Sequence, residues 1–107
     1  MKYKNTLQKG SVRYLVFKEG ETWYAVGFEF NIVESGDTPE EAMLLLFEAL
    51  KGYLEAAKKM KLRPNVLNQK TDPEYEQMWQ SLKSGKSKKE KIFSSGSLNI
   101  AQALQFA

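Results

Sequence analysis

Three carboxylates that lie close together in the sequence, Glu29, Glu34 and Asp37, are the side chains best suited to chemistry. Carboxylates that converge from different elements can hold Mg²⁺ for phosphodiester hydrolysis. The simpler interpretation, which we favour, is that Glu29 and Glu34 are solvent-facing strand charges and that Asp37 supports a turn. No Gly-rich phosphate loop accompanies them in the sequence. We therefore predict no bound metal ion and no cofactor.

The amino-acid composition removes most other routes to catalysis, because the 107 residues include neither His nor Cys. Without Cys there are no disulfides, no thiolate metal sites and no cysteine nucleophile. Without His there is no Ser-His-Asp or Cys-His arrangement. We predict that the protein is not an enzyme and that it has no catalytic residues.

The net charge of +3 is unevenly distributed along the chain. Residues 1–60 carry a net charge of −1, whereas residues 61–107 carry +4, much of it in a lysine-rich run that includes Lys86, Lys88 and Lys89. Such a run can contact the phosphates of a nucleic acid, although a solvated linker is the commoner interpretation. Nucleic acid is the less favoured partner here, because the run contains no arginine and no aromatic residue.

The length of the chain corresponds to one domain. No apolar segment reaches the length of a signal peptide or of a membrane span. We therefore expect a cytoplasmic protein that has no membrane partner.

The N-terminal half carries strand signals. β-Branched and aromatic residues predict strands over 12–18 and 22–28, joined as a hairpin by a turn at Gly20. A third strand or an irregular edge is expected over 29–34, because apolar and polar residues alternate there.

A helix start follows this predicted sheet. Gly36 and Asp37 are typical of a tight turn, Thr38 is suited to cap the helix, and Glu41 completes a capping box. We expect this helix to run to about Lys59, which places basic residues at its negative end.

A second helix is predicted over about 73–83, where apolar residues recur at helical spacing. The predicted fold is α+β, with an antiparallel three-stranded sheet in a β-β-β-α core packed on one long helix and with a second, C-terminal helix. We expect residues 1–82 to form the domain and residues 83–107 to form a basic, partly flexible tail. Within that tail, 92–93 could be a short strand, and 98–106 is ambiguous between helix and strand.

The long helix has a wider apolar stripe than contact with one sheet requires, since nearly every residue over 42–50 is apolar. Two explanations remain open. Either the second helix folds back over Leu44, Leu45 and Phe47, or these residues form a partner or dimer interface. Trp79 is a further candidate for that interface, because aromatic residues are enriched there.

The segment around this helix start resembles a known family. Gly36-Asp37-Thr38, Glu41-Ala42, Glu48-Ala49 and Tyr53-Leu54-Glu55 match, in order and spacing, the pattern of the HicB-like antitoxin domain. The resemblance covers about residues 11–60. It implies a partial RNase H-like fold without nuclease activity. Members of this family typically neutralise HicA, a small basic toxin that cleaves mRNA.

We therefore expect a non-catalytic HicB-like protein-binding domain, an antitoxin that binds and neutralises a HicA-like toxin and that forms a homodimer. The alternative is a nucleic-acid-binding regulator that uses the Lys-rich C-terminal tail. The chain departs from the family pattern at Phe28-Glu29-Phe30, where the family has a Pro-Glu-Leu-like segment. Most of the C-terminal DNA-binding module that many members carry is also missing.

Overall fold

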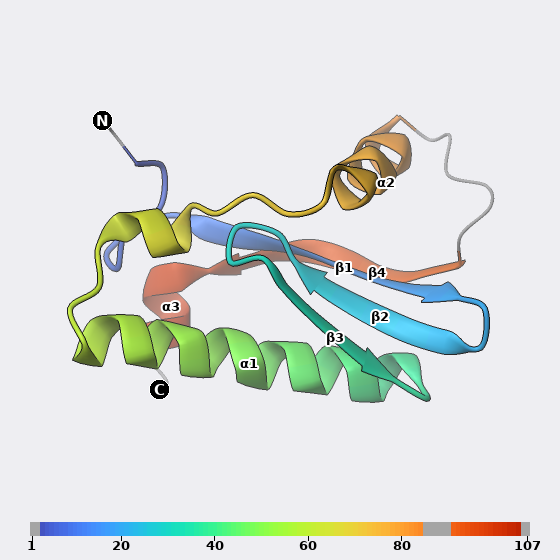
Figure 1. Ribbon diagram of the computed structural model, residues 1–107, viewed down its shortest axis with the longest axis horizontal. Coiled ribbons are helices and arrows are strands. Elements are labelled where there is room, and N and C mark those ends of the chain that lie inside the picture. Colours follow the sequence, from blue (N-terminus) through green and yellow to red (C-terminus); the bar gives the residue numbers. More distant parts are fainter. Residues whose placement is uncertain (1–2, 85–90, 106–107) are drawn as a thin grey trace.

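The computed structural model describes residues 3–84 and 91–105, which form an antiparallel sheet with helices on both faces (Figure 1). The strands stand in the order β3-β2-β1-β4. In chain order, the elements are β1 (Ser11–Glu19), β2 (Thr22–Gly27), β3 (Ile32–Gly36), α1 (Pro39–Lys59), the 3₁₀ helix η1 (Pro64–Leu67), α2 (Pro73–Lys83), β4 (Lys91–Asn99) and α3 (Ile100–Gln105). The α+β class, the hairpin and both predicted helices are confirmed.

The first two strands form the expected hairpin, with Gly20 at a φ of +63° in its turn. The third strand begins at Ile32, three residues later than predicted. The intervening residues make a turn, in which the Asn31 N–H donates to the Phe28 carbonyl over 3.1 Å and Asn31 takes a φ of +53°. Asn tolerates this left-handed conformation better than most residues, so the chain reverses here before β3 starts.

The predicted three-stranded sheet is wrong, because β4 adds a fourth strand antiparallel to β1. The register runs from Ser11 opposite Asn99 to Lys18 opposite Lys91, with a bulge at Phe93. Serines and a glycine fill the middle of β4, and these residues have weak strand propensity. Backbone pairing with β1 therefore forms the strand where the local sequence does not predict one. Residues 91–105, expected in a partly flexible tail, form β4 and α3.

One face of the sheet is covered by α1. Leu46, Leu50 and Leu54 recur along the helix and are fully buried against the strands. Ala42 and Ala57 continue the same stripe, so the spacing of the apolar residues along α1 aligns its buried side with the sheet. The whole cluster consists of Val12, Val16, Ala25, Phe30, Ala42, Leu46, Leu50, Leu54, Ala57, Leu67 and Ile100.

The opposite face of the sheet is covered by α2, and the two helices lie on opposite sides of the strands in Figure 1. This second cluster consists of Leu15, Phe17, Val26, Phe28, Met78 and Trp79. The explanation in which α2 folds back over Leu44, Leu45 and Phe47 is therefore wrong. The inner strands β1 and β2 carry apolar residues on both faces, so the second face also needs a cover, and α2 supplies it.

The N-terminal segment is fastened to the loop that follows α1. Asn5 is buried, and its Nδ2 donates to the carbonyls of Ser11 and Leu67, each over 2.9 Å. Asn68 Nδ2 in turn donates to the Asn5 carbonyl over 2.9 Å. A polar side chain can be buried at low cost when its hydrogen bonds are made in this way. In the part of the chain that the structure describes, no helix has the length and hydrophobicity needed to cross a membrane.

Candidate protein-binding surface

The turn that starts α1 is built as the sequence predicts. The Glu41 N–H donates to Thr38 Oγ1 over 3.1 Å, and Pro39 occupies the first turn of the helix. The Glu41 carboxylate accepts from the Asp37 N–H over 2.9 Å, one residue before the cap itself. The helix therefore begins at a fixed position, which sets the orientation of every side chain along it.

Gly36 allows this turn because it has no side chain. A Cβ on Gly36 would lie 2.7 Å from Glu41 Oε1 and 2.9 Å from the Ala42 nitrogen. The end of β3 can therefore approach the first turn of α1 this closely only without a side chain. Asp37 contributes through its backbone N–H, and its side chain is exposed. The residues of the family-like motif thus position the helix.

The outer face of α1 exposes two large apolar side chains. Leu44 is 59% exposed and Leu45 is 38% exposed. Residues four apart share a helix face, so Leu44 lies between Glu40 and Glu48, both of which are exposed. Glu41 lies beside Leu45 for the same reason. We call this set of two leucines and three glutamates the α1 outer patch.

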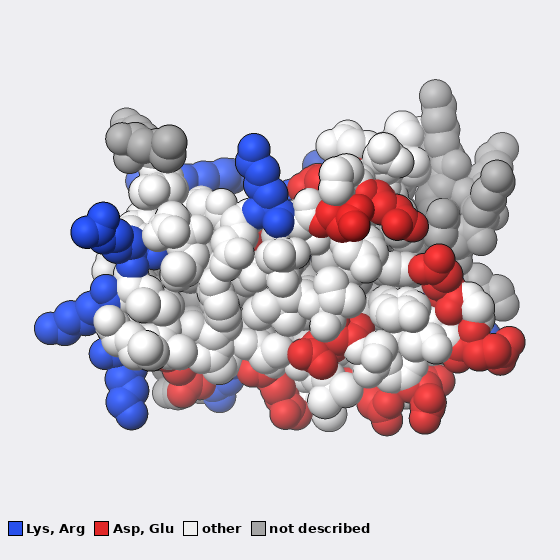
Figure 2. Space-filling view, in the orientation of Figure 1, with Lys and Arg blue, Asp and Glu red and all other residues white. Residues whose placement is uncertain are grey.

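On the face seen in Figure 2, charge is separated among the described residues, and the α1 outer patch lies in the acidic half. β2 pairs with β3 so that Trp23 is opposite Gly36, which places the β1–β2 turn and the start of α1 at one end of the sheet. Carboxylates gather over this end, and lysine and arginine side chains gather over the opposite end, where α1 finishes (Figure 2). The exposed acidic residues at the first end are Glu19, Glu21, Asp37, Glu40 and Glu41, and the exposed basic residues at the second end include Lys58, Lys59, Lys61 and Arg63.

Phe47 points to a different side of α1. Its ring meets the Tyr14 ring of β1 edge-on, with 5.1 Å between centroids, and it is half-buried. Beside it lies an apolar groove of about 210 Å³ between α1 and the β4–α3 segment, lined by Phe47, Lys51, Leu98 and Ala103. We call this the α1–β4 groove.

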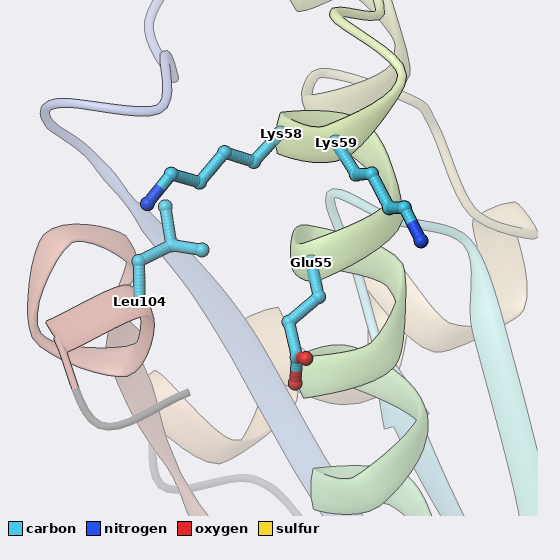
Figure 3. A pocket seen from close by; sticks show the side chains of 4 residues that line it. All are labelled: Glu55, Lys58, Lys59 and Leu104. Atoms are coloured by element: carbon cyan, nitrogen blue, oxygen red, sulfur yellow. The ribbon is translucent and has the colours of Figure 1, made fainter.

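A second hollow follows toward the C-terminal end of α1. It measures about 410 Å³ and is lined by Glu55, Lys58, Lys59 and Leu104 (Figure 3). Lys58 extends toward Leu104 of α3, whereas Lys59 points to the other side of the helix. The four lining residues are mostly charged and exposed, so this hollow is a shallow continuation of the surface.

Trp79 is separated from the other predicted interface residues. It is buried on the α2 side of the sheet, where its ring meets Phe28 with 5.4 Å between centroids. The four predicted interface residues therefore do not form one surface. Leu44 and Leu45 belong to the α1 outer patch, Phe47 lines the α1–β4 groove, and Trp79 belongs to the core beneath α2.

An ion-pair cluster that the sequence did not predict holds α2 on the sheet. Arg13 Nε lies 2.6 Å from Glu29 Oε2, and Arg13 Nη2 lies 2.7 Å from Glu76 Oε2. The guanidinium also lies over the ring of Phe28, 4.6 Å from its centroid, and 5.4 Å from that of Trp79. The only available signal was an arginine near the start of a strand whose next four residues are apolar or aromatic. We call Arg13, Glu29 and Glu76 the arginine clamp.

The protonation equilibria of the clamp reflect these contacts. The hydrogen bond with Glu76 raises the pKa of Arg13, and the hydrogen bond with Arg13 lowers the pKa of Glu76. Both shifts favour the charged forms. Arg13 and Glu76 are therefore both charged near neutral pH.

The proposed magnesium ligands are not brought together. Glu29 accepts hydrogen bonds from Arg13 Nε and, over 2.7 Å, from the Arg13 backbone N–H. Within residues 3–84 and 91–105, no three His, Cys, Asp or Glu residues form a group that could hold a metal ion. Lys86, Lys88 and Lys89, the proposed nucleic-acid contacts, lie outside the described residues.

Comparisons with known proteins give no relative. No family model matches the sequence, and neither the curated proteins nor the solved structures yield a match.

Proposed function

We propose that this chain is a non-catalytic, cytoplasmic protein-binding domain of HicB-like type, an antitoxin that binds and neutralises a small, basic, HicA-like toxin that cleaves mRNA. The observation that carries the proposal is the α1 outer patch, in which exposed Leu44 and Leu45 stand among Glu40, Glu41 and Glu48. Apolar side chains at the centre of a patch and charges around them are the arrangement of a protein interface.

The charges of the patch favour a basic partner. Complementary charge accelerates encounter and selects among partners, and the carboxylates of the β1–β2 turn extend the acidic surface beyond α1 (Figure 2). The leucines would then supply the desolvated contacts that hold the complex. A small basic ribonuclease offers the matching charge, and covering its surface would block access to mRNA.

The family-like motif lies on the same segment. Gly36-Asp37-Thr38 starts α1, and Glu41-Ala42 and Glu48-Ala49 each contribute an exposed glutamate to the α1 outer patch and a more buried alanine. The resemblance and the patch therefore support the same proposal, although the first rests on the residues that start α1 and the second on the side chains exposed along it.

The experiment is co-expression of the full chain with the small basic protein encoded by the neighbouring gene, followed by co-purification and an mRNA-cleavage assay. We expect a complex and loss of cleavage. Leu44→Glu with Leu45→Glu should abolish both while leaving the melting temperature nearly unchanged, because both side chains are exposed.

Leu62→Glu is the matched control, since Leu62 is 40% exposed but lies beyond the end of α1. It should leave the complex intact. A chain that inhibits no ribonuclease, or one that binds DNA or RNA with steep salt dependence and binds no protein, would contradict the proposal and favour the nucleic-acid-binding alternative.

A further inference from the structure

The outer edge of β4 has the properties of an open pairing surface. The sheet order places β4 at one edge, and within the described residues no strand pairs with its outer side. The strand is nine residues long, and from Ile92 to Asn99 it contains no charged residue and no proline. Natural proteins usually blunt an exposed edge with charges, proline or short length.

The other edge of the sheet is blunted in this way. β3 has five residues, includes Glu34, and lies against α1. The contrast between the two edges indicates that β4 is the one left open for pairing.

An exposed aromatic side chain accompanies the open edge. Phe93 is 46% exposed, and the bulge places it on the α1 side of the sheet, where its ring meets Trp23 edge-on with 6.2 Å between centroids. At the opposite end of β4, Leu98 lines the α1–β4 groove. One strand thus carries a protruding apolar ring at one end and an apolar hollow at the other, both on the same face.

We propose that β4 pairs with β4 of a second copy of this chain, antiparallel across a two-fold axis that passes between the two Gly96 residues. The two sheets would join into one continuous sheet, as in other strand-addition interfaces. In this register Ser94 lies opposite Leu98 of the other copy. The bulge places Phe93 beside Ser94 on the same face, so Phe93 of each copy comes beside Leu98 of the other and covers the α1–β4 groove.

The side chains of β4 suit pairing with themselves. Directly opposed residues of an antiparallel pair share a face, and next to the axis these residues are serine and glycine. Small residues at the axis leave room for the two phenylalanine rings, and no charge faces a like charge. A two-fold axis requires that the same surface of each copy contact the other. Here the Phe93 ring of each copy meets the α1–β4 groove of its partner.

This proposal is independent of the proposed function. It uses the β4 edge and the α1–β4 groove, whereas the proposed toxin contact uses Leu44 and Leu45. The chain could form the dimer without being an antitoxin, and the reverse also holds.

The first test is the mass of the full chain in solution, measured by light scattering and sedimentation equilibrium from micromolar to millimolar concentration. We expect a dimer. Phe93→Ser and Ser97→Lys should each raise the dimer dissociation constant by about tenfold or more, because they remove the apolar ring and place like charges across the axis. Ser35 is an exposed serine on β3, the opposite edge strand, and Ser35→Lys should leave the dimer dissociation constant unchanged.

The second test uses the absence of cysteine from the chain. Under mild oxidation, an equimolar mixture of the Ser95→Cys and Ser97→Cys proteins should give a disulfide-linked dimer that retains its thermal melting transition, because these positions lie opposite one another across the axis. A mixture of the Ser95→Cys and Ser35→Cys proteins should not. This measurement still tests whether two copies pair through β4 if the Phe93→Ser protein fails to fold. A chain that remains monomeric at millimolar concentration, or a Ser95→Cys protein that cross-links to Ser35→Cys faster than to Ser97→Cys, would overturn the proposal.

Discussion

The helices that cover the two faces of the sheet are held there by different kinds of contact. On one face, the 21 residues of α1 bury an aliphatic stripe dominated by leucine. On the other, the 11 residues of α2 cover a smaller cluster in which half of the residues are aromatic. The arginine clamp joins this helix to β1 and to the turn after β2. One face is held almost entirely by apolar burial, and the other by burial together with charge.

This difference has consequences for stability and for binding. Apolar burial does not depend on the ionisation of side chains and is not weakened by charge screening, so the α1 face should persist wherever the chain is folded. Partly exposed ion pairs are screened by salt and lost on protonation, so the α2 face should loosen first. A helix anchored as firmly as α1 can present exposed leucines on its outer side without losing its position.

The largest effect should come from Leu50→Ala on the α1 face. Leu50 is fully buried, and its Cδ2 lies 2.7 Å from the position that a Cβ on Gly27 would occupy, so helix and strand are in close contact. We expect a loss of about 3–4 kcal/mol in the free energy of unfolding, measured by urea denaturation. Leu44→Ala, on the exposed side of the same helix, should change it by less than about 0.5 kcal/mol. Equal losses would mean that the buried side of α1 is wrongly assigned.

A smaller and more local effect should come from Arg13→Met on the α2 face. Met keeps much of the apolar stem, but Glu29, whose side chain is only 15% exposed, loses its cation. We expect a loss of about 2 kcal/mol, below that for a fully buried pair because the clamp is partly solvated. The fluorescence of Trp79 should shift to the red in a Trp23→Phe background as α2 loosens.

Arg63→Met is the control for the clamp, because Arg63 is exposed after the end of α1. An Arg13→Met protein with unchanged stability and unchanged Trp79 emission would show that apolar packing alone holds α2. The two faces would then not differ as described above.

Local signals were enough to predict the α1 side of the molecule. Thr38 and Pro39 give the start of α1, and Gly20 gives the hairpin turn. Each of these features depends on residues within a few positions of one another. They can therefore be read from the sequence without knowing the rest of the fold.

The features that were missed depend on long-range pairing. β4 is a strand because it pairs with β1, about 80 residues earlier in the chain, and its serines give no local signal. The clamp joins Arg13 to Glu76 across 63 positions. Trp79 was grouped with Leu44 because aromatic residues are enriched at interfaces, but the sequence does not say which face of the sheet a helix covers.

The helix caps test the same contrast with a smaller effect. Thr38→Ala removes the acceptor of the Glu41 N–H at the start of α1 and should cost about 1 kcal/mol. Thr38→Ser keeps the acceptor and should cost much less. The corresponding change at α2, Asp72→Ala, removes the acceptor of the Glu74 N–H. Because α2 has less apolar burial to hold it, hydrogen exchange should accelerate along most of α2 after Asp72→Ala but only in the first turn of α1 after Thr38→Ala.

The smallest effect should come from Glu76→Gln, measured as a function of pH. The hydrogen bond from Arg13 lowers the pKa of Glu76 below its ordinary value of 4.5. A carboxyl group with a lowered folded-state pKa stabilises the fold above its unfolded-state pKa, and this contribution is lost as the pH falls through the folded-state pKa. We therefore expect Glu76→Gln to cost less than about 1 kcal/mol at pH 7, since the pair is partly exposed, and nothing once the pH is well below 4.5. Thermal melting at pH 7, 5 and 3 measures this difference. A difference in melting temperature between the two proteins that persists at the lowest pH would show that the amide side chain disturbs the packing of α2. The charge of Glu76 would then not be what distinguishes this face of the sheet.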